Sequence, residues 1–401
     1  MLVYPNYDKC LLNVISSIRR YYSTPIEYKT LPVLDKELDR GYKNIVLIVM
    51  DGMGASVIEK NLGRGDFLRK NISQKITTVY PSTTAAAMTS IYTGVSPNEH
   101  GWLGWSLFFK EFCRCIDVLT NNDSFTKQPM TQPNIGSFVM PYETIFKDIA
   151  VSRKIAVQPF AIQPAGVNIP EMGVIRKRAD SFGGMCSLIK KICATEQNTL
   201  TLAYWTNPDE IMHKTGCTSA ETKAAMLEFN EGLQQLAESL TDTLLIITAD
   251  HGMIDIEEEV FINAIPEIDS CLSMPPSIEG RAAAFFVKSE LMDEFRWQFN
   301  KALGKDFKLM TSGELLDKQI LGGGRTHRKT YDFLGDFVAC AIGKKVIRYR
   351  TLNSKPKSKH LASHAGLTDD EMTVPLIIVP TEITETTAAQ ESYLEMMYGN
   401  I

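Results

Sequence analysis

Hydrophobic runs of strand length recur along the chain and alternate with longer stretches of helical periodicity. The first run, residues 44–50, is apolar at nearly every position. Such uninterrupted runs are typical of strands in a parallel sheet that helices cover on both faces. Further strands are predicted at 155–160, 199–205, 243–249 and 374–379, and helices at 11–22, 181–195 and 219–240. This alternation predicts an α/β fold, a mostly parallel sheet flanked by helices.

Residues 275–350 follow a different pattern. An apolar strand is predicted at 281–287, a helix at 289–303, and further strands at 307–310 and 337–347, with a triple glycine between the last two. Strands grouped around one helix indicate a small α+β insert, or cap, rather than more of the parallel sheet. The predicted organisation is an N-terminal helical arm at 1–40, a catalytic core at 41–274 and 351–401, and the insert at 275–350.

Composition and charge exclude several classes of protein. The 401 residues include 42 Lys and Arg against 47 Asp and Glu, a net charge of −5, which argues against a partner that is a nucleic-acid polymer. Membrane-spanning helices need about 18 to 20 apolar residues, and no run approaches that length. The first 25 residues lack the pattern of a secretory signal, and the eight cysteines are scattered. We therefore expect a cytoplasmic protein with reduced cysteines; the sequence does not indicate its oligomeric state.

Carboxylate and imidazole side chains follow the predicted strands. The carboxyl ends of parallel strands meet at one edge of a sheet, so these side chains are expected to lie close together. Six donors suffice for two divalent ions that each keep an open position. Mixed imidazole and carboxylate ligands favour zinc, with manganese and iron also compatible. The six predicted metal ligands are Asp51, Asp209, His213, Asp250, His251 and His364.

Each of these residues also has a simpler interpretation when it is taken alone. Asp51 could cap a helix, Asp209 and His213 could be surface residues one helical turn apart, and His364 could be an ordinary loop residue with His360 as its competitor. The occurrence of all six donors after strands favours the metal site over these separate explanations.

Hydroxyl and aromatic side chains supply the remaining candidates. Ser82, Thr83 and Thr84 follow a predicted turn and precede a helix of small residues, where the helix dipole favours both a nucleophile and an anionic group. At least one of the three is expected to cap that helix instead. Four aromatic residues could stack on a substrate, although packing in the core is the alternative for each: Trp102, Trp105, Tyr204 and Trp205.

The sequence resembles the alkaline phosphatase superfamily, and within it the type I phosphodiesterase/nucleotide pyrophosphatase family. The resemblance spans residues 44–380 in the family's order. The motifs that carry it are Ile48-Val49-Met50-Asp51-Gly52, Tyr80-Pro81-Ser82-Thr83-Thr84, Tyr92-Thr93-Gly94, His100-Gly101, Pro208-Asp209 with His213 and Gly216, Ala249-Asp250-His251-Gly252-Met253 and His364-Ala365-Gly366-Leu367.

The resemblance implies a role for each matching position. It implies that Thr84, with Thr83 left open as the neighbour, is the nucleophile and forms a phospho-threonine intermediate. The implied substrate is a small phosphoester cleaved at a phosphodiester or pyrophosphate bond. One implied metal ion is held by Asp51, Asp250, His251 and Thr84, and the other by Asp209, His213 and His364.

Two departures from the family pattern bear on the substrate. Nucleotide-specific members carry an asparagine three residues beyond the nucleophile, where this chain has Ala87, and the usual Gly-x-His-Gly-Gly is Ser-His-Ala-Gly here. The first departure puts a nucleotide substrate in doubt but not the metal chemistry. Phosphomonoesterase, phosphonate hydrolase and phosphotransferase or mutase activities therefore remain alternatives, and a non-catalytic binding module is disfavoured because ligands and hydroxyl are all present. A sulfatase is disfavoured because nothing around Thr84 resembles a formylglycine motif.

Overall fold

The main body of the protein is built on a seven-stranded sheet. The computed structural model describes residues 1–131, 134–159, 173–350 and 360–383. The sheet has the order β2-β18-β9-β1-β8-β6-β7. Its strands are β1 (Asn44–Met50), β2 (Ile72–Thr77), β6 (Arg153–Pro159), β7 (Val174–Ala179), β8 (Thr199–Trp205), β9 (Thr243–Thr248) and β18 (Thr373–Pro380).

Strand direction brings distant segments of the chain to one edge of this sheet. β1, β6, β7, β8 and β9 are parallel, and β18 runs antiparallel between β9 and β2. β18 therefore begins at the edge where the parallel strands end, so the segment that precedes β18 arrives at the same edge as the segments that follow β1, β8 and β9. This is the edge where α/β proteins place their functional residues.

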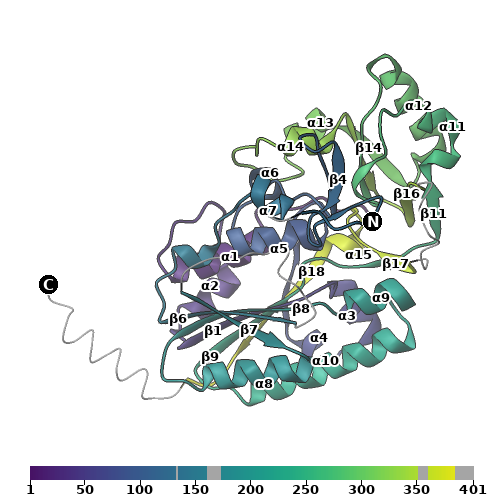
Figure 1. Ribbon diagram of the computed structural model, residues 1–401. Coiled ribbons are helices and arrows are strands. Elements are labelled where there is room, and N and C mark those ends of the chain that lie inside the picture. The colour runs from purple at the N-terminus through teal and green to yellow at the C-terminus, as the bar shows by residue number, and fades with distance from the viewer. Residues whose placement is uncertain (132–133, 160–172, 351–359, 384–401) are drawn as a thin grey trace.

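Helices cover both faces of the sheet, as the buried strands require. β1, β8 and β9 are buried along their whole length, which leaves helices to provide the polar exterior. Figure 1 shows α8 and α10 along one face and α1, α2 and α5 along the other. The helices around this sheet are α1 (Leu11–Tyr21), α2 (Pro32–Leu38), α3 (Ala55–Asn61), α4 (Phe67–Lys70), α5 (Thr84–Thr93), α8 (Phe182–Cys193), α9 (Asp209–Thr215) and α10 (Ala220–Glu238).

A second sheet of seven antiparallel strands lies beyond the edge at which the parallel strands end (Figure 1). Its order is β14-β15-β13-β12-β3-β4-β5. The predicted insert supplies β12 (Ser277–Glu279), β13 (Ala282–Phe285), β14 (Phe307–Thr311) and β15 (Phe337–Ala341), packed against α12 (Met292–Leu303). The other strands come from 106–123, within the predicted core: β3 (Ser106–Phe109), β4 (Arg114–Asp117) and β5 (Asn122–Asp123).

Shorter elements complete the described chain. Two small sheets pair β10 (Ile254–Asp255) with β17 (Ala362–Ser363) and β11 (Glu258–Phe261) with β16 (Lys345–Arg348). The remaining short helices are α6 (Pro97–His100), α7 (Ile135–Val139), α11 (Pro266–Asp269), α13 (Ser312–Asp317), α14 (Thr330–Leu334) and α15 (Asp369–Met372), with 3-10 turns at Ile145–Lys147, Ile262–Ala264 and Ser289–Leu291. In the described part of the chain, no helix has both the length and the apolar composition needed to cross a membrane.

A buried ion pair joins the two sheets. Arg281, just before β13, donates from Nε and Nη2 to the two carboxylate oxygens of Glu371 in α15, both at 2.7 Å, and neither side chain is exposed. Arg281 also donates to the carbonyls of Gly343 and Lys345. Because each buried charge has several partners, the pair fixes the second sheet against the start of β18.

The predicted α/β fold is confirmed, and the first strand, residues 44–50, matches β1 residue for residue. The predicted helix at 11–22 is α1, whose apolar face packs in the same core as the parallel sheet. Sequence analysis missed the edge strands β2 and β7, whose exposed positions carry polar and charged residues rather than an apolar run. No strand is predicted from the sequence at 106–109, where the structure has β3 (Ser106–Phe109).

Candidate metal centre

Two acidic residues and one histidine meet at the ends of β1 and β9. Asp51 follows β1, and Asp250 and His251 follow β9. His251 Nε2 lies 3.2 Å from Asp51 Oδ1 and 3.5 Å from Asp250 Oδ2. Ligand atoms of Asp51, Asp250 and His251 all lie within 4.8 Å of one another, and so do those of Asp209, His251 and His364. One histidine thus bridges two groups of candidate ligands.

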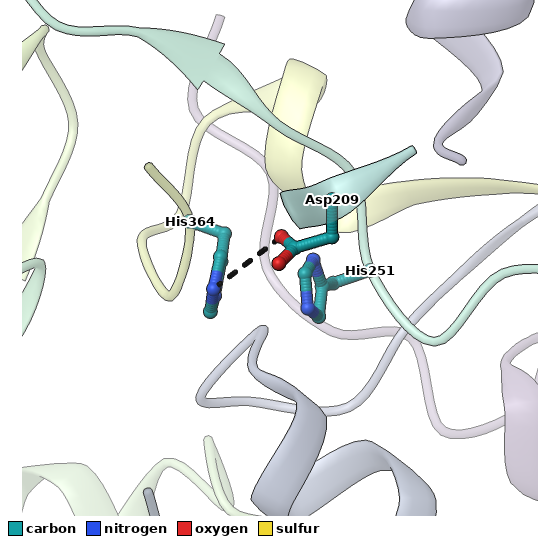
Figure 2. Close-up of side chains that lie close together, drawn as sticks. All are labelled: Asp209, His251 and His364. Atoms are coloured by element: carbon teal, nitrogen blue, oxygen red, sulfur yellow. Dashed lines mark ion pairs between the residues drawn. The ribbon is translucent and has the colours of Figure 1, made fainter. Parts of the chain in front are cut away.

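The second group comes from α9 and from the loop before β18. Asp209 opens α9, and its Oδ2 lies 3.4 Å from His213 Nε2 one turn later. His364 Nε2 lies 3.8 Å from Asp209 Oδ1, and its ring stacks on that of His251 at 3.9 Å. Figure 2 shows the side chains of Asp209 from α9, His251 from the segment after β9 and His364 from the loop before β18 close together. All six predicted ligands therefore lie in one continuous cluster, and the ring of His360 lies 4.5 Å from that of His213, at the cluster's margin.

The three histidines are oriented in the same way. His251 Nδ1 lies 2.9 Å from the carbonyl of Gly252, His213 Nδ1 2.8 Å from that of Ala362, and His364 Nδ1 3.2 Å from that of Ser82. A carbonyl oxygen only accepts, so each Nδ1 carries the proton and each Nε2 points toward the carboxylates. Histidines that bind metals are held by such a bond from the other ring nitrogen.

The carboxyl groups of the cluster are difficult to ionise without added positive charge. Burial and the charge of Asp51 raise the pKa of Asp209 well above its ordinary value and that of Asp250 to about 7. Burial alone would lower the pKa of His251, but Asp250 and Asp51 raise it to about 10. Burial and the charge on His251 lower the pKa of His364 well below its usual range. Cations would stabilise the ionised carboxylates, so these raised pKa values favour cations at the cluster.

The donor set fits divalent metal ions. Asp209 Oδ1 and Asp250 Oδ2 are buried and accept no hydrogen bond from the described residues, although a buried carboxylate oxygen normally has a partner. Imidazole nitrogen and carboxylate oxygen are ligands of zinc and of several transition metals. Unpartnered oxygens beside three oriented imidazoles are therefore what a site for such ions requires.

The two threonines at the start of α5 have different surroundings. Thr84 Oγ1 lies 3.2 Å from His251 Nε2 and 3.5 Å from each carboxylate oxygen of Asp51. Thr83 Oγ1 instead donates to Glu279 Oε1 at 2.9 Å, on the second sheet. Thr83 is the N-cap residue of α5 by position, although its side chain makes no capping bond. Of these two hydroxyls, only that of Thr84 reaches the cluster.

The loop that carries His364 is strained and tightly held. Ala365 adopts φ +95°, a conformation that favours glycine, and glycine is what the family pattern has there. Gly366 donates its N–H to Glu371 Oε1 at 2.7 Å and accepts from the Ser82 hydroxyl at 2.7 Å. Sequence analysis identified neither Glu371 nor Ser82 as supports of the site, because their partners are distant in sequence.

The aromatic candidates lie in different environments. Trp102 is 1% exposed and donates from Nε1 to the carbonyl of Met140, and its ring packs in the core of the second sheet, as in the alternative interpretation. Trp205 is buried against Phe182. Tyr204 is buried too, and its hydroxyl donates to Oδ2 of Asp51, one of the candidate ligands. Trp105 is 42% exposed and stays available.

Comparison of the sequence with known families identifies the chain. Residues 45–341 match the family described as type I phosphodiesterase / nucleotide pyrophosphatase, across well over half of the chain. The protein belongs to this family. It is thereby a member of the alkaline phosphatase superfamily, in a family of phosphodiesterases and pyrophosphatases. No curated protein matches the sequence significantly.

Solved structures share the fold of this family member at low sequence identity. The murine ectonucleotide pyrophosphatase/phosphodiesterase 5 is 14% identical with a TM-score of 0.61, over 85% of this chain and 91% of that one. The human protein of the same name is 15% identical with a TM-score of 0.59, over 85% and 91%. Phosphonoacetate hydrolase from Sinorhizobium meliloti 1021, in complex with phosphonoformate, is 15% identical with a TM-score of 0.61, over 86% and 91%. The predicted superfamily and fold are confirmed.

Metal-dependent stabilisation should grow with pH. Without metal, the folded chain holds protons on Asp250 up to about pH 7 and on His251 up to about pH 10, whereas unfolded Asp and His titrate near 3.9 and 6.5. The folded state then binds more protons, so the metal-free protein loses stability as pH rises through this window. Metal binding must displace these protons. We expect the rise in melting temperature on adding zinc to increase from about pH 6 to pH 9; a rise independent of pH would contradict this electrostatic account.

Proposed function

We propose that this protein hydrolyses phosphodiester or pyrophosphate bonds of small molecules through a covalent phospho-threonine at Thr84. The observation that carries the proposal is the position of the Thr84 hydroxyl, 3.2 Å from His251 Nε2 and 3.5 Å from both oxygens of Asp51. A hydroxyl beside a cluster of six candidate ligands has the arrangement of an activated nucleophile.

The cluster would hold two divalent ions, zinc first among the candidates. Asp51, Asp250, His251 and Thr84 would hold one, and Asp209, His213 and His364 the other; His251 lies close enough to both groups to contribute to either. When bound, such ions would lower the pKa of the Thr84 hydroxyl and neutralise charge on the phosphoryl oxygens.

The chain's own residues orient the reaction. Thr84 Oγ1 would attack phosphorus, and the leaving group would depart with the electron pair of the broken P–O bond. Water would then attack phosphorus and break its bond to Thr84 Oγ1, which releases a phosphomonoester that keeps the second ester group. The first backbone N–H groups of α5 have no partner within the helix and would donate to the phosphoryl oxygens. Tyr204 holds Asp51, which in turn orients the Thr84 hydroxyl. Ala87 is buried in the core and offers no side-chain donor, which disfavours a substrate that needs one at this position.

Phosphonate hydrolysis is the second candidate, because a phosphonoacetate hydrolase shares the fold across most of its length. The test compares bis-p-nitrophenyl phosphate, p-nitrophenyl phosphate and phosphonoacetate, with and without a chelator, on protein of measured metal content. We expect about two ions per chain and a chelator-sensitive preference for the diester. Preference for phosphonoacetate would move the function to the second candidate, and a new ester formed from added glycerol would identify a phosphotransferase. A fully metal-loaded protein that turns over none of them would overturn the proposal.

A further inference from the structure

One acidic side chain of the second sheet reaches the nucleophile turn. Glu279 ends β12, and its Oε1 accepts hydrogen bonds from the Thr83 hydroxyl at 2.9 Å and from the Trp105 N–H at 2.8 Å. Thr83 precedes the candidate nucleophile directly. Among the described residues, Oε2 of Glu279 makes no hydrogen bond, and the residue is only half-buried. One carboxylate oxygen is thus anchored while the other stays available beside the site.

A strained and closely packed backbone holds the carboxylate of Glu279 in place. Ile278 adopts φ +71°, a rare conformation for a β-branched residue and a form of strain that clusters at functional sites. Gly104 packs so closely that a Cβ there would lie 2.7 Å from Ile278 Cγ2 and 3.1 Å from Glu279 Cγ. Two residues beyond Glu279, the buried pair of Arg281 with Glu371 ties this part of the sheet to the core. Glu279 is therefore rigidly placed.

Glu279 lies next to the candidate nucleophile. Its Oε1 is 2.9 Å from the hydroxyl of Thr83, and the hydroxyl of the following residue, Thr84, lies 3.2 Å from His251 Nε2. Burial raises the pKa of Glu279 itself, while its two hydrogen-bond donors, His251 and Arg348 favour its ionised form. At alkaline pH a phosphoryl group bound next to Thr84 would therefore meet a fixed negative charge from the second sheet.

We propose that Glu279 is a specificity-determining residue that makes the site select singly charged phosphodiesters over doubly charged phosphomonoesters and phosphonates. The inference rests on the proposed function and deepens it by naming the substrate class. A phosphomonoester carries a charge of about −1.5 to −2 near neutral pH, whereas a diester carries only one. A fixed carboxylate repels the more highly charged ligand more strongly, which is selection by an unfavourable contact rather than by an added attraction.

The test compares two esters that release the same leaving group. Zinc-loaded wild-type protein, Glu279→Gln and Glu279→Asp are assayed at about pH 8 with bis-p-nitrophenyl phosphate and p-nitrophenyl phosphate. Glu290→Gln is the matched control, since Glu290 lies on the same insert, is exposed and bonds to its neighbour Ser289. We expect Glu279→Gln to lower the diester-to-monoester ratio of kcat/KM by about tenfold. Glu279→Asp and the control should leave the ratio within about twofold of the wild type. An unchanged ratio in a folded, fully metal-loaded Glu279→Gln protein overturns the proposal.

A binding measurement separates this inference from the proposed function. The dissociation constant of inorganic phosphate, a doubly charged ligand, is measured by calorimetry on the same zinc-loaded proteins. If the wild type hydrolyses neither ester, the proposed function fails, but phosphate binding to Glu279→Gln that is about tenfold tighter still supports the role of Glu279. Unchanged phosphate affinity overturns it. Glu279→Ala replaces Glu279→Gln if the latter does not bind metal, and failure of both to do so would assign Glu279 to the structure instead.

Discussion

Thr84→Ala should lower kcat for bis-p-nitrophenyl phosphate by at least about 10³-fold while metal content stays near that of the wild type. The reason is geometric: the Thr84 hydroxyl lies among His251 and the Asp51 oxygens, and no other hydroxyl in the described chain makes this set of contacts. Steady-state kinetics and metal analysis on the same preparation measure both quantities.

The neighbouring threonine provides the matched control. Thr83 donates to Glu279 rather than to the cluster, so Thr83→Ala should reduce kcat by less than about tenfold. Thr84→Ser, which keeps a hydroxyl, should retain part of the activity. If Thr83→Ala loses turnover and Thr84→Ala keeps it, the nucleophile is Thr83 and the assignment is wrong by one residue.

Asp209→Asn should abolish most activity and should raise the stability of the metal-free protein. Removing a candidate ligand at the centre of the second group should lower kcat/KM by more than about 100-fold. The raised pKa of Asp209 means that the metal-free fold prefers this carboxyl uncharged. An uncharged amide should therefore make the metal-free protein more stable than the metal-free wild type.

The two stabilities are compared by thermal unfolding at about pH 8 with chelator and with zinc. The wild type should gain about 3 kcal/mol when zinc is at about 100 times its dissociation constant, whereas Asp209→Asn should gain much less. Asp255→Asn is the control for loss of a carboxylate outside the cluster, because Asp255 Oδ1 accepts a hydrogen bond from the Cys217 N–H instead. Lower stability of metal-free Asp209→Asn than of the metal-free wild type would indicate that Asp209 serves the fold rather than a metal.

The fold could be predicted where strands are buried and therefore apolar, and not where strands are exposed. β1, β8 and β9 are buried on both faces, so their sequences are continuous apolar runs with clear ends. β7 is an edge strand with four exposed positions, and its charged residues hide it. β3 joins the second sheet by pairing with β12, more than 150 residues away, and β4 joins it through β3. No local pattern records the pairing of β3 with β12.

The same distinction applies to the site. Asp51, Asp250 and His251 could be proposed as neighbours because each follows a parallel strand, and the sheet brings such positions together. The choice between Thr83 and Thr84 was left open, since consecutive hydroxyls look alike until their partners are known. Glu279 was missed for the same reason: its partner Thr83 lies 196 residues earlier in the chain. Local sequence thus identifies ligand types, while side-chain partners emerge only from the folded chain.

The covalent intermediate is the most direct test of the mechanism. Zinc-loaded protein turning over bis-p-nitrophenyl phosphate is quenched with acid on a millisecond scale, digested and analysed by peptide mass spectrometry. The account predicts a phosphoryl group, still carrying one nitrophenyl ester, on Thr84, and its absence from the Thr84→Ala protein. A turning-over enzyme with no covalent adduct, or with the adduct on another residue, would contradict it.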